Sequence, residues 1–405
     1  MTAPVRPHPL ARSRAADRAD RALAKAWDKG WLPVPPLDAA TLWNEAVRSF
    51  GGNARAGETG GRSFADVADF RERLDRLTKA LEGEAALNSL GRAMAHGQLK
   101  RTIVNRLRFG ALWADEPDLA RTRIAPPIIV VGHMRSGTTR IHKLLAADPA
   151  HSFTRYCDAY HPLPDRFGID RAMSALEIAA LGALNPWLQT IHPMRAGEVE
   201  EELAWTAAAL HHSIYESQWH IPSYSAWSEA ADAAPIYREF DRILRTDAAT
   251  RGLAERPRVL KVPAFTEDLA TLLTQFPDAR LVVSQRDPGA VRRSAVSLVA
   301  NQMAIQSDAC DLGWIEEEWR RKLALREARM DSALADWDGP IARLNFSALN
   351  EDWEREIERA YRELGLFLTP EARRRMKRVM RRGADGDHAA HSHQLDRFAA
   401  QEQLS

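Results

Sequence analysis

The 405-residue chain has few cysteines, no large excess of charge of either sign and no long uninterrupted apolar run. Its two cysteines, Cys157 and Cys310, are too few for a disulfide framework or a cysteine-rich zinc site, and they favour a reducing compartment. Lysine and arginine total 56 against 55 aspartate and glutamate, so the net charge is +1. A charge field over the whole protein is therefore excluded as a basis for binding nucleic acid or an anionic membrane, and any anion site must be local.

Targeting segments are not evident either. Residues 1–17 contain arginine and proline but no apolar core, unlike a secretory signal. The most apolar stretch, residues 172–191, is interrupted by Glu177, Asn185 and Pro186, which favours a buried helix over a membrane span. We therefore expect a cytoplasmic protein.

The first third of the chain predicts helices and no recognisable chemical motif. Residues 14–27 and 64–87 place apolar side chains at helical spacing, and the glycine-rich residues 51–61 predict a loop between two such blocks. The simplest interpretation is a helical N-terminal extension, residues 1–120, that packs on a core domain formed by residues 121–400.

The pattern then changes to that of an α/β sheet. Residues 128–131 are a run of β-branched side chains, typical of a strand buried on both faces, and residues 139–147 continue with helical spacing. A further helix is predicted at residues 266–276. Three more strands are predicted at residues 258–262, 280–284 and 341–346. Strands that alternate with helices predict a central parallel sheet.

The loop between the first strand and its helix, Gly132-His133-Met134-Arg135-Ser136-Gly137-Thr138-Thr139, has the composition of a phosphate-binding loop. Glycines allow a tight turn that exposes successive N–H groups, and the helix N-terminus adds the positive end of its dipole. The glycine spacing is that of a nucleoside-triphosphate P-loop, but Thr138 stands where such loops have lysine. The cation is instead Arg135, which disfavours a triphosphate hydrolase.

Residues 128–145, IIVVGHMRSGTTRIHKLL, resemble the 5′-phosphosulfate loop of sulfotransferases that use 3′-phosphoadenosine 5′-phosphosulfate (PAPS), above all the bacterial branch with its R-S-G-T-T sequence. The resemblance extends in islands from about Pro126 to Phe398. It implies a P-loop NTPase-like three-layer α/β fold with a central parallel sheet and a helical acceptor-side insertion at residues 171–255. It also implies PAPS as donor without a metal, adenosine 3′,5′-bisphosphate as product, and a donor loop formed by Arg135, Ser136, Gly137, Thr138 and Thr139.

A second anion site is predicted at the end of the third strand. Arg286 follows this strand, and Ser294 lies in the helix that Asp287 and Pro288 begin. Family members use an arginine and a serine at this spacing for the 3′-phosphate.

The basic segment at residues 371–382 predicts a solvated helix. Its end, Arg381-Arg382-Gly383, resembles the family's C-terminal 3′-phosphate segment. The resemblance continues through Gly386, Asp387, His391, Leu395 and Phe398, with His388 and His393 in place of the usual tryptophan and tyrosine.

Sulfuryl transfer requires cations for the developing charge and a base for the acceptor hydroxyl. By resemblance, Arg135 stabilises the leaving phosphate, and it does so electrostatically because arginine does not release its proton at neutral pH. Lys261 matches a family lysine that contacts the transferred group.

The base is less directly indicated, because Phe265 stands where the bacterial branch usually has a histidine. Asp158, at the position of a family glutamate, is the first candidate, and His192 is the second. The neighbouring acidic cluster, residues 200–202, also resembles the bacterial pattern.

Other functions compete with this interpretation. An NTP-dependent kinase on the same fold is disfavoured by Thr138 and by the lack of an acidic Mg²⁺ site after a neighbouring strand. A non-catalytic nucleotide-binding protein is compatible with Phe265, and nucleic-acid binding would rest on the basic C-terminal helix alone. The acceptor hydroxyl or amine, on a small molecule, lipid or glycan, is not specified. Four tryptophans fit an apolar or aromatic acceptor site and core packing equally well: Trp187, Trp205, Trp219 and Trp227.

Overall fold

The computed structural model describes residues 5–163 and 168–383, and its centre is a wholly parallel sheet with strand order β2-β1-β3-β4. The strands are β1 (Ile128–Val131), β2 (Val259–Lys261), β3 (Arg280–Gln285) and β4 (Ile341–Asn345). All four predicted strands are confirmed, with small differences at their ends. Phe346 begins a helix, α17 (Phe346–Glu351), and does not end β4.

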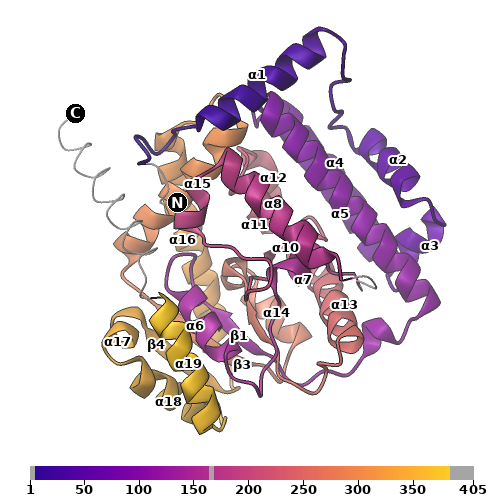
Figure 1. Ribbon diagram of the computed structural model, residues 1–405. Coiled ribbons are helices and arrows are strands. Elements are labelled where there is room, and N and C mark those ends of the chain that lie inside the picture. The colour runs from indigo at the N-terminus through magenta and orange to yellow at the C-terminus, as the bar shows by residue number, and fades with distance from the viewer. Residues whose placement is uncertain (1–4, 164–167, 384–405) are drawn as a thin grey trace.

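Alternate side chains of the strands enter two separate cores, which gives three layers. Ile129 and Val131 point into a core that also contains side chains of α13 (Ala234–Thr250), α14 (Leu269–Gln275) and α16 (Leu312–Ala335). Ile128 and Val130 point to the opposite side, where they meet α6 (Thr138–Ala146), α18 (Trp353–Glu363) and α19 (Pro370–Gly383). In Figure 1 α6 and α19 lie to the left of β1 and β3, and α13 and α14 lie to the right. Because both faces are covered, β1 is apolar throughout.

The predicted N-terminal helices are confirmed as α1 (Arg14–Asp28), α2 (Ala39–Phe50), α4 (Phe64–Gly83) and α5 (Ser89–Asp115). Each begins at a residue whose side chain accepts a hydrogen bond from the first turn: Ser13, Asp38, Ser63 and Asn88. The predicted glycine-rich loop at residues 51–61 is wrong in its middle. Asn53 caps a short helix there, α3 (Ala54–Thr59), whose Gly57 packs closely on α5.

This close packing predicts opposite effects for two glycines on α5. A methyl group on Gly110 would overlap the carbonyl oxygen of Gly57, whereas Gly97 has no atom within 4 Å of such a group. We expect Gly110→Ala to destabilise the protein by about 1–3 kcal/mol. Gly97→Ala should stabilise it by about 0.5–1 kcal/mol, because alanine loses less backbone entropy in a helix. Chemical denaturation measures both, and equal midpoints for the two variants would contradict the close contact.

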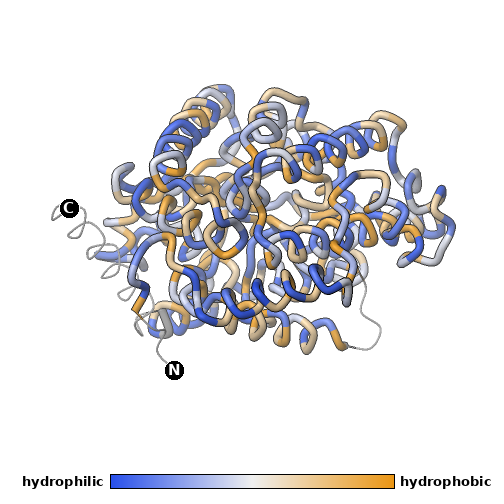
Figure 2. The backbone as a smooth tube through the Cα atoms, turned by 90° about the horizontal axis from the view of Figure 1, so that it is seen from above, coloured by the Kyte–Doolittle hydropathy of each residue, from blue (hydrophilic) through white to orange (hydrophobic). Residues whose placement is uncertain are grey.

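Short helices fill the middle of the chain, as the predicted helical insertion requires. They are α7 (Tyr156–Tyr160), α8 (Asp170–Leu184), α9 (Leu188–Ile191), α10 (Leu203–Ala207), α11 (His212–Tyr215) and α12 (Pro222–Ala230), and the longer α15 (Pro288–Gln306) follows β3. Seen from above, most helices alternate between hydrophilic and hydrophobic residues (Figure 2), as amphipathic elements do. The division into extension, core and acceptor-side insertion stays a prediction.

The prediction of one buried helix over residues 172–191 is wrong. α8 ends at Leu184, since Pro186 disfavours helical backbone at the preceding residue, Asn185, and lacks the N–H that would continue the helix. Of the residues in α8 only Ser174 is buried, so composition alone misjudged its surroundings. Among the described residues, none of the helices combines the length and apolarity needed to cross a bilayer.

Candidate active site

The chain turns from β1 into α6 through a tight loop. Gly132 and Gly137 have φ values of 146° and 99°, a region that favours glycine. Ser136 closes the turn, because its backbone N–H and its Oγ both donate to the His133 carbonyl oxygen, at 3.1 and 2.7 Å. α6 begins at Thr138, so the N–H groups of its first turn point back toward the loop. This geometry suits an anion.

Arg135 stands at the centre of the loop with a φ of 68°, a conformation that non-glycine residues rarely adopt. Its Nε donates to Ser294 Oγ at 2.8 Å, and its Nη1 donates to the Ile191 carbonyl oxygen at 2.9 Å. Burial, with a contribution from the charge of Arg286, lowers the pKa of Arg135 to about 10, so the side chain is a cation at neutral pH. The loop therefore holds a partly buried positive charge fixed on two sides.

Arg286 directly follows β3 and contacts the same loop. Its Nη1 donates to the Arg135 carbonyl oxygen at 2.7 Å, and its guanidinium lies 4.2 Å from the centre of the Phe346 ring. Burial lowers its pKa. Ser294, on α15, is buried next to Arg135. The structure thus brings the predicted pair, Arg286 and Ser294, to Arg135 from opposite sides.

Phe346 was not singled out by sequence reasoning. Besides lying under Arg286, it blocks any side chain at position 137, since a methyl group on Gly137 would overlap its ring. The available signal was its position directly after a parallel strand, where ligand-binding residues of α/β sheets gather.

Lys261 ends β2 and links the loop to an acidic segment. Its side chain is buried, and its Nζ donates to Thr139 Oγ1 at 3.2 Å and contacts the Glu201 carboxylate. The backbone N–H of Lys261 donates to Glu202 Oε2 at 2.9 Å. Burial raises the pKa of Glu202 to about 7. A lysine and two threonines from the predicted set therefore meet at the N-terminus of α6: Lys261, Thr138 and Thr139.

His192 follows α9 and pairs with a carboxylate. Its Nε2 lies 3.3 Å from Glu200 Oε1, and 27% of its side chain is exposed. Burial alone would lower the pKa of His192, but the negative charges of Glu200 and Glu201 outweigh it and raise that pKa. Ligand atoms of His192, Glu200 and Glu201 lie within 4.8 Å of one another, a spacing that a cation could use. Here the ammonium group of Lys261 contacts Glu201.

The structure places Asp158 in a different cluster. Asp158 accepts hydrogen bonds from Arg155 Nε and Nη2, at 2.7 and 2.8 Å, and lies 2.8 Å from Arg251 Nη2. Burial would raise its pKa, but the hydrogen bonds from Arg155 and the charge of Arg251 outweigh burial and lower it. A carboxylate held between two cations has little tendency to take up a proton.

Phe265 is part of the apolar core. Its ring lies 5.6 Å from that of Phe240 and 6.2 Å from that of Tyr237, and the side chain is fully buried. The position that carries a histidine in the bacterial branch thus serves packing in this chain.

The predicted C-terminal segment is described only in part. Arg381, Arg382 and Gly383 lie in the last turn of α19, and Arg381 is exposed. The matches at Gly386, Asp387, His391, Leu395 and Phe398, and the departures at His388 and His393, lie outside the described residues.

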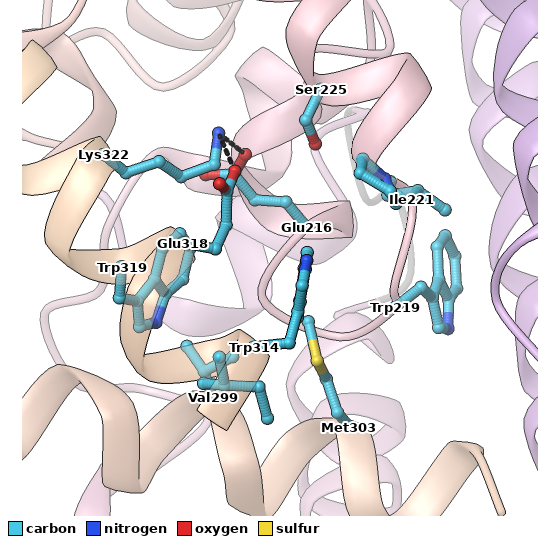
Figure 3. A pocket seen from close by; sticks show the side chains of 12 residues that line it. Glu216, Trp219, Ile221, Ser225, Val299, Met303, Trp314, Glu318, Trp319 and Lys322 are labelled. Carbon is cyan, nitrogen blue, oxygen red and sulfur yellow. Dashed lines mark ion pairs between the residues drawn. The ribbon is translucent and has the colours of Figure 1, made fainter. Parts of the chain in front are cut away.

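A pocket lies near the loop, between α12, α15 and α16 (Figure 3). Trp219, Trp314 and Trp319 line it, and an ion pair between Lys322 and Glu216 closes one side. Two other candidate tryptophans, Trp187 and Trp205, are buried, and Trp227 is partly exposed.

This pocket is connected to the loop by apolar packing. Met134, the residue before Arg135, packs on the cluster that contains Trp319, Val299 and Met303. Trp319, Val299 and Met303 also line the pocket.

A parallel α/β sheet with a glycine-bounded, basic loop after β1 defines the class: α/β proteins with a P-loop-like fold. Within this class the chain belongs to the sulfotransferase family, because the model described as "Sulfotransferase family" matches residues 126–370. The family and the fold predicted from the loop are confirmed.

Solved structures agree with this assignment. The chain is similar to sulfotransferase STF1 from Mycobacterium tuberculosis H37Rv, with a TM-score of 0.75 and 27% identity over 91% of this chain and 100% of that one. Sulfotransferase STF9 from Mycobacterium avium also has a TM-score of 0.75, at 21% identity over 85% of this chain and 88% of that one, and supports the fold alone.

Curated relatives are the omega-hydroxy-beta-dihydromenaquinone-9 sulfotransferases Stf3 of Mycobacterium bovis and Mycobacterium tuberculosis. Each is 29% identical over 189 residues, which is 44% of this chain. The match spans about half of the relatives' length, 47%.

Proposed function

We propose that this protein transfers a sulfuryl group from PAPS to the hydroxyl of an apolar acceptor and releases adenosine 3′,5′-bisphosphate. The observation that carries the proposal is the convergence of Arg135, Lys261, Arg286 and Ser294 on one loop, where the carboxyl ends of β1, β2 and β3 meet. Three separate segments supply these side chains, namely the loop after β1, the end of β2 and the stretch from β3 into α15, so the cluster is a product of the fold.

PAPS would bind with its 5′ end at the loop of Arg135 and its 3′-phosphate at Arg286. N–H groups at the start of α6, the hydroxyls of Thr138 and Thr139, and Arg135 suit the 5′-phosphosulfate. Arg286 and Ser294 suit the 3′-phosphate, which PAPS has and ATP lacks. A kinase is less compatible, because β2 ends at Lys261, β3 and β4 are directly followed by Arg286 and Phe346, and none of these three is a carboxylate that would hold Mg²⁺.

The chemistry assigns a role to each remaining group. The acceptor oxygen forms a bond to sulfur while the bond from sulfur to the 5′-phosphate oxygen breaks, and the electron pair of that bond stays on the leaving phosphate. Arg135 and Lys261 stabilise the negative charge on the leaving oxygen and the sulfonate oxygens. His192 takes the acceptor proton, and Glu200 orients the ring by accepting from Nε2–H, which makes Nδ1 the basic nitrogen.

For the acceptor we propose an apolar molecule with a hydroxyl group at its end. The curated relatives are named for such a substrate, a hydroxylated menaquinone.

Thermal stability with nucleotides tests the donor directly. We expect adenosine 3′,5′-bisphosphate to raise the melting temperature without Mg²⁺, since a ligand at a hundredfold excess over its Kd adds about 2.7 kcal/mol to the stability of the native state. ADP should have a much smaller effect, and Arg286→Ala should reduce the difference between the two. A shift with Mg-ATP alone would instead favour the kinase.

A further inference from the structure

Helix α8 presents its apolar residues to solvent. Leu176 and Met173 are 65% and 45% exposed, and Ile169, directly before the helix, is 55% exposed. With Ala180 and Ala183 these side chains recur at the spacing of one helical stripe. The other exposed positions of the helix are Arg171, Ala172, Ala175 and Ala179. The outer face therefore carries a single charge.

The carboxylates of α8 are turned the other way. Glu177 accepts a hydrogen bond from Arg101 Nη1 at 3.0 Å and lies 3.3 Å from His161 Nε2, and Asp170 lies 4.0 Å from His161 Nδ1. A surface helix of a water-soluble domain has the opposite arrangement, with its charges outward. An apolar face that is kept outward, while the charges pair inward, fits an apolar environment outside the protein.

Helix α1 adjoins this face and is basic. Ser13 Oγ donates to the carbonyl oxygen of Leu184, the last residue of α8, at 2.6 Å, and Leu184 packs with Ala16 and Leu23. Figure 1 shows α1 across the top of the molecule, above α8. Five exposed cations follow α1 at helical spacing: Arg14, Arg18, Arg21, Lys25 and Lys29.

The segment after α1 adds exposed apolar side chains. Trp31, Leu32 and Val34 are 68%, 51% and 52% exposed. A tryptophan with aliphatic neighbours next to basic residues is the composition that lies at a bilayer surface.

We propose that α8, α1 and residues 31–34 dock this protein on the surface of an anionic lipid bilayer. The apolar outer face of α8 and the Trp31 segment enter the interface, and the cations of α1 bind lipid phosphates. Charge complementarity selects this occupant, because five cations in one stripe would repel a second copy that presents the same stripe.

Docking would also serve the proposed reaction. α8 leads through α9 to Ile191, whose carbonyl oxygen holds Arg135, and to His192. An apolar acceptor dissolved in the bilayer would thus arrive next to the base. This last step rests on the proposed function, whereas the docking itself does not.

Sedimentation of the full chain with vesicles tests the docking. We expect binding to vesicles of phosphatidylcholine with phosphatidylglycerol, and binding weaker by at least about tenfold with phosphatidylcholine alone or in high salt. The double variant Met173→Glu/Leu176→Glu and the double variant Arg18→Glu/Arg21→Glu should each lose about tenfold or more. Phe367→Glu is the matched control, because Phe367 is 82% exposed but follows α18, and it should bind like the unaltered protein.

Two results would overturn the docking. One is vesicle binding that is equal with both lipid compositions and unchanged in the α8 variant. The other is an α8 variant that converts a dimer to a monomer in light scattering, which would make α8 a subunit interface. Each variant must keep its thermal shift with adenosine 3′,5′-bisphosphate, which shows that it is folded. The vesicle assay uses neither donor nor acceptor, so a failure to bind vesicles would not contradict the proposed transfer reaction. If adenosine 3′,5′-bisphosphate does not raise the melting temperature of the unaltered protein, the transfer reaction is contradicted and the docking is not.

Discussion

Arg135→Ala should lower kcat/KM for sulfuryl transfer by on the order of 10²–10³-fold or more, which is the usual cost of removing one preorganised group that stabilises developing charge. Arg135 is suited to this role because it is partly buried, remains charged at neutral pH and is held by Ser294 and the Ile191 carbonyl oxygen. Steady-state rates with PAPS and a hydroxylated apolar acceptor measure the effect. The loss should appear mainly in kcat, since the charge is needed most in the transition state.

Two further variants separate charge from geometry at this position. Arg135→Lys keeps the cation but lacks the planar group that reaches both Ser294 and Ile191, so its activity should lie between those of alanine and arginine. Arg195→Ala is the control, because the Arg195 side chain is 76% exposed and pairs only loosely with Glu198, at 3.5 Å. Activity of Arg135→Ala within about threefold of the unaltered protein would exclude this role.

His192→Gln should lower kcat by on the order of 10²–10⁴-fold and remove the rising limb on the acidic side of the pH profile, as expected for loss of a general base. A histidine accepts a proton only when neutral, so activity should rise as the pH rises through the pKa of His192. Because Glu200 and Glu201 raise that pKa, the limb should lie above pH 6.5, the usual value for histidine. Initial rates across a pH series measure its position.

Glu200, the carboxylate that pairs with His192, provides an independent test of the direction in which the pKa of His192 is shifted. Glu200→Gln removes a negative charge that favours protonated His192, so the limb should move to lower pH. Asp158→Asn should leave the limb in place and lower stability, since it leaves Arg155 and Arg251 without their shared carboxylate. If the limb disappears with Asp158→Asn and persists with His192→Gln, Asp158 is the base.

The donor loop and the sheet could be predicted because their signals are local. Residues 132–139 lie together in the sequence, so glycine positions, cation and hydroxyls are visible without a fold, and the run at residues 128–131 shows a strand buried on both faces. The pairing of Arg286 with Ser294 could also be predicted, because Arg286 directly follows β3 and Ser294 lies in the next helix, α15.

The base could not be chosen in this way. The sequence ranked Asp158 before His192 by resemblance alone, whereas the difference between them lies in their partners. Arg251 neutralises Asp158 from a distant segment, while Glu200 raises the pKa of His192 beside the loop. Phe346 under Arg286 is a contact of the same kind.

By itself, the sequence determined the sulfotransferase family, the parallel sheet and the tight glycine-bounded loop after its first strand, because these depend on the order of neighbouring residues and on periodic burial. Only the tertiary structure decided which ionisable groups meet and which faces remain exposed. α8 shows why: its composition predicts a buried helix, yet Glu177 pairs inward and Leu176 points outward. Charge pairing and burial depend on what lies across from a side chain, and that is set by segments far away in the chain.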